Sequence, residues 1–188
     1  MEMGRIKLLV VVLLAIPLFY GCSSDDDPGS DGSLLGDWRM TSMDYDGEIE
    51  TDFQGIPITT RFEGVGKNLD IVMTFTESPN EFVASGSYDL ELTFSGLGQT
   101  ETETTSIEDF ESGGTWSLSG EKLTLDGSLF ALSFDDEPVA DNGGLGEVTI
   151  EELTQTTLRL SMKATEEFTQ DGTDASATIM STIVFTKE

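Results

Sequence analysis

The residue with the most definite chemical potential is Cys22, the single cysteine of a 188-residue chain. It follows a small glycine and an apolar run from Leu8 to Tyr20, and that run follows Arg5 and Lys7. A positive start, an apolar stretch and a small residue form the layout of a secretory signal peptide. The run is about 13 residues long, whereas a membrane-spanning helix needs about 20. We therefore expect residues 1–21 to be cleaved off, and the alternative is an uncleaved anchor.

The residues up to Cys22 resemble a bacterial lipobox, the site at which a lipoprotein precursor is lipidated and cut. This resemblance implies that the Cys22 sulfur carries diacylglycerol and that the new N-terminal amine is acylated too. Two or more acyl chains hold a protein stably on a bilayer, whereas a single chain does so only marginally. The membrane is thus the first partner that we expect, through a lipid on Cys22.

An acidic stretch follows the cysteine directly, formed by Ser24, Asp25, Asp26 and Asp27. It resembles the lipoprotein export signal of Bacteroidota-type bacteria, which implies an outer-membrane protein that faces the cell exterior. The alternative is a solvated acidic linker on a periplasm-facing protein. In both cases residues 22–33, composed almost entirely of Ser, Asp, Gly and Pro, form a flexible tether.

Several kinds of site are made improbable by composition. The absence of histidine removes the commonest general base and transition-metal ligand, and a lone cysteine excludes an intramolecular disulfide and a Cys-based zinc site. Carboxylates are so abundant that no single pair indicates glycoside hydrolysis. We therefore expect no enzyme, no cofactor and no metal site.

One stretch leaves a metal question open. The residues from Asp135 to Asn142 offer clustered oxygen ligands of the kind that Ca²⁺ takes. Their spacing does not match an EF-hand loop, and a solvated acidic loop is the simpler interpretation.

The net charge of -27 limits the partners of the chain. A surface this acidic repels nucleic-acid phosphates and anionic lipid headgroups. We expect no nucleic-acid partner, and a membrane attachment that depends on the lipid anchor. The sequence indicates no particular protein partner.

The elements that must carry any site are strands. Apolar and polar residues alternate through segments such as 69–75, 88–94, 158–162 and 179–185, whereas no segment carries a helical apolar stripe. A period of two with one apolar face predicts half-buried antiparallel strands. Strands joined in sequence predict a meander that closes into a barrel or folds into a sandwich.

Turns and weaker segments are also visible. Ser119 to Lys122 predicts a tight hairpin between two short strands. The Thr–Glu alternation from Thr100 to Thr105 has no apolar face and predicts an exposed edge or a protruding hairpin. Residues 54–66 and 97–106 are expected to be loops or ragged edge strands.

Two motifs resemble those of lipocalins. Gly36-Asp37-Trp38 is similar to the Gly-x-Trp that opens a lipocalin barrel, and Gly114 to Leu125 is similar to a later hairpin of the lipocalin-like domains in Bacteroidota lipoproteins. The resemblance implies an all-β fold, an antiparallel meander closed into a lipocalin-like up-and-down barrel of about eight strands over residues 34–188. The arginine that caps the tryptophan in animal lipocalins has no evident counterpart, because Arg159 lies on the polar face of its strand.

A barrel of this size either fills with side chains or holds one small ligand. We expect a surface-exposed outer-membrane lipoprotein that binds a small apolar or amphipathic molecule. The alternative is a non-enzymatic structural or protein-interaction lipoprotein with a solid core. The candidate ligand-cavity residues are the inward apolar positions Trp38, Met73, Phe75, Tyr88, Leu90, Leu92, Phe94, Trp116, Phe130, Leu132 and Phe134.

Overall fold

The structure is a computed structural model that describes residues 32–53, 55–127, 133–134, 137–138, 147–170 and 173–188. The predictions for Cys22, Ser24 and Asp25 to Asp27 lie outside these residues, as do the backbones of Phe130 and Leu132 and most of the 135–142 stretch. The described residues contain strands and turns only. Among them, no helix is long and apolar enough to cross a membrane.

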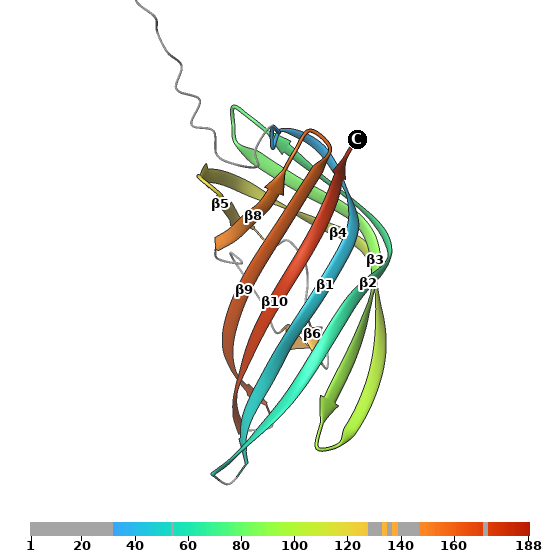
Figure 1. The fold of residues 1–188 in the computed structure, drawn as a ribbon, viewed down its shortest axis with the longest axis vertical. Helices are drawn as coiled ribbons and strands as arrows, with labels where there is room; N and C mark the ends of the chain where they lie inside the picture. The colour runs from blue at the N-terminus through green and yellow to red at the C-terminus, as the bar shows by residue number, and fades with distance from the viewer. Residues whose placement is uncertain (1–31, 54, 128–132, 135–136, 139–146, 171–172) are drawn as a thin grey trace, which may run out of the picture.

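Eight strands form a closed antiparallel barrel in the order β1-β10-β9-β8-β5-β4-β3-β2 (Figure 1). The barrel strands are β1 (Gly36–Phe53), β2 (Ile56–Thr76), β3 (Glu81–Gly96), β4 (Gln99–Ser119), β5 (Lys122–Asp126), β8 (Glu147–Leu153), β9 (Thr157–Gln170) and β10 (Thr173–Lys187). Two further strands, β6 (Ser133–Phe134) and β7 (Glu137–Pro138), pair with each other in a separate small sheet. Because each barrel strand pairs with its neighbour in sequence and β10 returns to β1, the predicted all-β lipocalin-like meander barrel is confirmed.

The alternating pattern explains which face of each strand is buried. In β10, residues at odd positions from Ala175 to Phe185 are buried, whereas those at even positions are half-buried or exposed. The apolar ends of β2 and β3 follow the same rule. One contiguous core therefore runs through the inside of the barrel, and among the described residues this core contains no charged residue.

The weak segments belong to regular strands. Residues 54–66 and 97–106 were expected to be loops or ragged edge strands. Of these, residues 56–66 and 99–106 are regular strand and extend β2 and β4 to 21 residues each. They are held by continuous backbone pairing with β1 and β3, which a strand can form without an apolar face of its own. Thr100 to Thr105 is exposed in the β3–β4 hairpin, as predicted.

The predicted Ser119–Lys122 hairpin is present. Ser119 pairs with Lys122, and Gly120 adopts a positive φ of 63° in the turn. A positive φ at the first turn position is what a tight hairpin requires, and glycine supplies it without a steric cost. Only one of the two flanking strands is short, because β4 continues far beyond the hairpin.

Register shifts occur in successive strands at a similar height. They fall at Met40/Ser42 in β1, at Lys67/Asp70 in β2 and opposite Gly86/Tyr88, where β4 carries the extra residue. Each bulge bends its strand and increases the local twist, which is how long strands curve around a barrel. At Gly86 the φ is 138°, and an added Cβ would lie 1.7 Å from the carbonyl oxygen of Asp70.

The barrel wall is uneven because β5 and β8 are only 5 and 7 residues long. They complete the ring at the top of Figure 1, where the C-terminus lies, and we call this the Trp38 end because Lys187, next to the C-terminus, packs against Trp38. The opposite end, with the β1–β2 and β3–β4 turns, we call the far end. Among the described residues, β4 before Thr115 pairs only with β3, and β9 after Met162 pairs only with β10.

Candidate functional site

At the Trp38 end, three consecutive backbone carbonyls are held by two side chains. Trp38 is 0% exposed, and its indole Nε1 donates to the carbonyl of Leu34 at 2.7 Å. Lys187 Nζ donates to the carbonyls of Ser33 and Leu35 at 2.9 and 2.7 Å, and lies 4.8 Å from the centroid of the Trp38 ring. Lys187 is thus the cation that packs against the Trp38 ring.

Aromatic rings pack tightly beside Trp38. The Phe75 ring lies 6.2 Å from that of Phe82 and meets the ring of Trp116 edge-on at 6.0 Å. Trp116 is half-buried, and its Nε1 donates to the carbonyl of Thr76 at 2.9 Å. These contacts fill the Trp38 end of the barrel with closely packed side chains.

The middle of the barrel contains hydroxyl groups among apolar side chains. Tyr45 is 3% exposed, and its hydroxyl lies 3.0 Å from the sulfur of Met43. Burial, with a smaller contribution from Tyr88, raises the pKa of Tyr45 well above its ordinary value. Tyr88 itself meets Phe110 edge-on at 6.0 Å, and Ser181 lies buried on β10 at the same level as Tyr45.

Toward the far end the inner face carries both buried and half-buried apolar side chains. Phe62 is buried and packs 6.1 Å from Phe94, which is only half-buried, as is Ile49, whereas Ala175 and Ala177 of β10 stay buried there. Added methyl groups at Gly47 would collide with the Phe62 ring at 2.6 Å, so that glycine provides room for the aromatic side chain. The far end is therefore the solvent-facing part of the apolar interior.

Two carboxylates join this inner face. Glu101 and Glu103 of β4 pair with Phe94 and Leu92 of β3, and directly opposed residues project from the same face of a sheet. Both glutamates are exposed, in contrast to Leu92. The interior thus changes from apolar to acidic where it meets solvent.

The predicted cavity residues divide into three groups. The buried ones are Trp38, Met73, Phe75, Tyr88, Leu90 and Leu92; the half-buried ones are Phe94 and Trp116; and Phe130, Leu132 and the side chain of Phe134 lie outside the described residues. The structure places the first group in one core but at two levels, because Trp38, Met73 and Phe75 belong to the packed end.

Sequence reasoning missed interior residues that the structure brings into the middle layer. Tyr45 and Phe62 went unnoticed because weakly apolar stretches flank them. Ser181 could have been predicted to point inward, since it alternates with the apolar residues Ile179 and Ile183 along the same strand.

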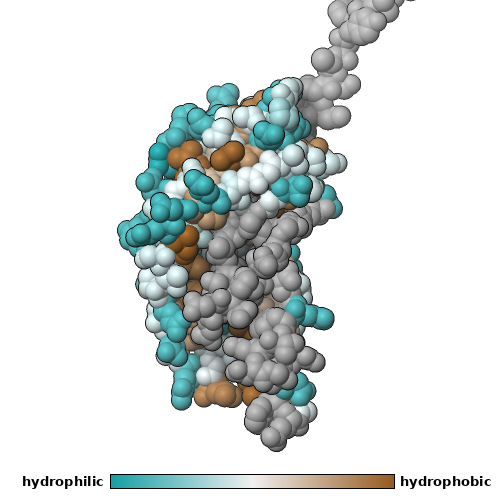
Figure 2. Space-filling view, turned by 180° about the vertical axis from the view of Figure 1, so that it is seen from behind, coloured by the Kyte–Doolittle hydropathy of each residue, from teal (hydrophilic) through white to brown (hydrophobic). Residues whose placement is uncertain are grey.

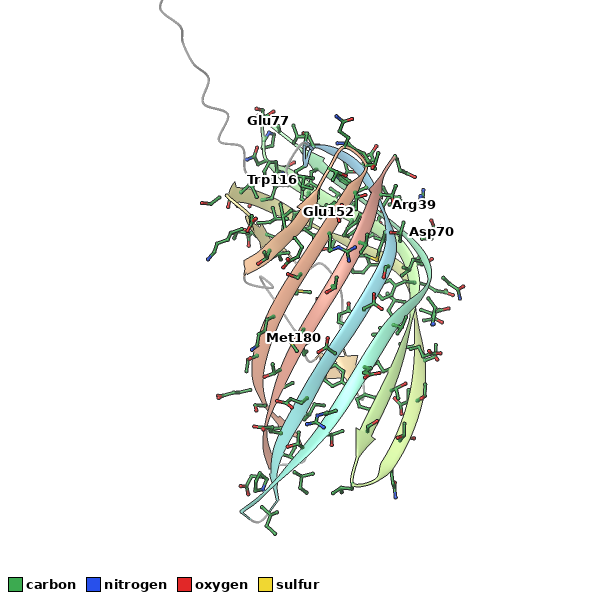
Figure 3. The ribbon with its side chains drawn as sticks, in the orientation of Figure 1. Arg39, Asp70, Glu77, Trp116, Glu152 and Met180 are labelled. Atoms are coloured by element: carbon green, nitrogen blue, oxygen red, sulfur yellow. The ribbon has the colours of Figure 1, made fainter. Side chains whose placement is uncertain are left out.

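The outer surface carries charge networks of a structural kind. Arg39 makes ion pairs of 2.7 Å with both Asp70 and Glu188, and these two carboxylates, Glu188 more than Asp70, raise its pKa (Figure 3). The pairs are exposed and contribute little individually. Figure 2 shows the described surface as mainly hydrophilic, with separate apolar spots. No group of three or more potential metal ligands occurs among the described residues.

Comparison with known proteins gives one match. A family model described as a lipocalin-like domain matches residues 34–160, more than half of the chain. No curated protein and no solved structure matches this chain. The match begins two residues before β1 and ends within β9, so that β10 completes the ring from outside the matched range. Lipocalin-like barrels are generally non-enzymatic folds whose interior holds a small ligand.

Proposed function

This chain belongs to the lipocalin-like domain family, and from that premise we propose that it is a lipid-anchored binding protein of the outer-membrane surface. Its barrel takes up a small apolar or amphipathic molecule at the far end. It performs no chemistry on that molecule.

The observation that carries the binding proposal is the presence of half-buried apolar side chains on the inner face toward the far end. Trp38, Phe75 and Phe185 are each at most 1% exposed at the packed end, whereas Ile49 and Phe94 are half-buried at the far end. Apolar side chains that line the inside of a barrel and meet solvent at one end are the arrangement of a small-molecule site. A ligand that enters there would remove this apolar surface from water.

The position of the anchor supports the same direction of entry. Lys187 ties Ser33 to the Trp38 end, and the eleven residues from Cys22 to Gly32 reach at most about 40 Å. A lipid on Cys22 therefore keeps the packed end toward the membrane and turns the far end toward the medium. The acidic surface of the domain keeps it away from the bilayer, because it is repelled by anionic headgroups.

Ligand binding is tested with N-phenyl-1-naphthylamine, an uncharged probe whose fluorescence rises in apolar surroundings. The protein is the chain from residue 22 onward with Cys22→Ala. We expect saturable binding that is weakened at least tenfold by Ile49→Glu, which places a charge on the inner face. The matched control is Val65→Glu, which places the same charge at an exposed position on the outer face of β2. Absence of saturable binding, or equal loss in both variants, contradicts the proposal.

The anchor and the location are tested in cells. Cys22→Ala should abolish labelling by radioactive palmitate and release the protein from the membrane fraction. Replacement of Asp25, Asp26 and Asp27 by Ala should leave labelling intact but abolish protease access on intact cells. A Cys22→Ala variant that still fractionates with the outer membrane rules out the anchor.

The packed Trp38 end favours a second candidate function. If side chains also fill the middle of the barrel, the domain is a solid structural or protein-interaction module. That function predicts no probe binding by the wild-type protein and stable association with another protein in the outer membrane. The probe experiment separates the two.

A further inference from the structure

Ser181 places an aliphatic hydroxyl among the mainly apolar side chains inside the barrel. It is 4% exposed. Among the described residues, the buried side chains other than Ser181 are aliphatic, aromatic or methionine side chains. Its neighbours on the inner face of β10, Ile179 and Ile183, are equally buried. The Ser181 Oγ has no hydrogen-bond partner among the described residues.

An unpaired buried hydroxyl is costly, because it gives up its hydrogen bonds to water without replacement. The apolar alternation of β10 would accept alanine or valine at this position. Ser181 lies directly opposite Tyr45 on β1 and Met162 on β9, so it belongs to the middle layer of the barrel. It therefore sits between the packed Trp38 end and the exposed far end, where a molecule that enters the barrel would come to rest.

We infer that the ligand of this barrel is an uncharged amphiphile with a hydroxyl or carbonyl group that hydrogen-bonds to Ser181 Oγ. This inference rests on the proposed binding function and specifies its ligand class. The apolar part of the molecule contacts the side chains around Phe62 and Leu92, which are buried on the same inner face. A site with a buried hydroxyl discriminates against molecules that cannot pair with it.

The charges of the barrel distinguish this ligand from a fatty-acid anion. No Lys, Arg, Asp or Glu is buried among the described residues, so a carboxylate in the middle layer would meet no cation there. A buried charge without a partner is strongly unfavourable. Glu101 and Glu103 on the inner face of β4, together with the net charge of -27, also repel an anion that approaches the far end.

The test compares 1-decanol with decanoate at pH 7.5, because the two share a chain and differ in the polar group. Each displaces N-phenyl-1-naphthylamine from the chain that starts at residue 22 with Cys22→Ala. We expect 1-decanol to bind at least tenfold more tightly than decanoate. Ser181→Ala should weaken 1-decanol binding about three- to tenfold, as the loss of one neutral hydrogen bond does. The affinity of each variant for the probe is measured directly and used to calculate the affinity for 1-decanol.

The control variant is Ser176→Ala, on the outer phase of the same strand, which should not alter 1-decanol binding. Urea unfolding of Ser181→Ala should show no loss of stability, because no bond within the protein is removed. If Ser181→Ala binds 1-decanol as the wild type does, or if decanoate binds as tightly as 1-decanol, the ligand class is overturned while probe binding upholds the binding function. If neither the probe nor the alcohol binds, both proposals fail.

Discussion

The ammonium group of Lys187 lies 4.8 Å from the centre of the Trp38 ring, and the two side chains together bind the carbonyls of residues 33, 34 and 35. The contact joins the last strand of the barrel to the entry of the first. It closes the Trp38 end at the point where the tether begins. A cation over an indole face is attractive, and more so when water is partly excluded, as it is around the buried ring.

Lys187→Met should destabilise the domain by about 1–3 kcal/mol, because it removes a cation–π contact and two hydrogen bonds to carbonyls. Urea unfolding followed by tryptophan fluorescence measures the change. The control is Lys67→Met, which removes an exposed ion pair with Glu91 at 3.9 Å and should change stability by less than about 0.5 kcal/mol. Equal effects of the two variants would contradict a role for Lys187 in closing the barrel.

Gly86→Ala should prevent the domain from reaching a stable fold. The new Cβ would lie 1.7 Å from the carbonyl oxygen of Asp70, and a φ of 138° is strained for any residue with a side chain. Gly98→Ala is the matched case, because it also has a positive φ but meets no atom within 4 Å, and it should cost only about 1 kcal/mol. Circular dichroism and soluble yield distinguish the two, and a well-folded Gly86→Ala protein would refute the bulge geometry.

Asp89 should titrate below the ordinary aspartate pKa of 3.8, because its carboxylate accepts hydrogen bonds from Ser106 and Asn68. A lowered folded-state pKa means that the stabilisation is present above about pH 4 and is lost as the pH falls through the folded value. NMR titration of the carboxyl carbon measures the pKa directly. Ser106→Ala removes the larger contribution and should raise the pKa toward 3.8, whereas no change would show that the bond is absent in solution.

Tyr45 should remain protonated at a pH at which an exposed tyrosine ionises. Burial raises its pKa, so the unfolded state loses this proton first and the contribution to stability declines as the pH rises above about 10. Absorbance at 295 nm reports phenolate in the chain from residue 22 onward, and Tyr45→Phe should reduce the alkaline loss of stability. Ionisation of Tyr45 with a midpoint near pH 10 in the folded protein would show that its site is open to water.

Much of the fold was readable in the chain because strand alternation is a local property. The segments around Leu92, Leu160 and Ile183 each repeat an apolar residue at every second position, and each became a strand with that face inside. Alternation could not decide between loop and edge strand for residues 54–66 and 97–106, since pairing with β1 and β3 holds most of them as strands without an apolar stripe.

The candidate site was readable only in part. Tyr88, Leu90 and Leu92 were selected by their alternation and do lie in the core, but Tyr45 and Ser181 were not selected. A serine that points into the barrel does not add to the apolar pattern by which inward residues are recognised. Once the inward positions of β10 are known, the place of Ser181 between Ile179 and Ile183 predicts that it points inward.

By itself, the sequence determined the phase of the strands, the excess of negative charge and, through resemblance, the barrel. These follow from residue types and their local spacing. The tertiary structure alone decided that Lys187 meets Trp38 from the other end of the chain, that β5 and β8 complete the wall only near that contact, and that Ser181 faces Tyr45 without a partner of its own. Each of these depends on the register between strands, and register is set by packing and closure of the whole ring rather than by any one segment.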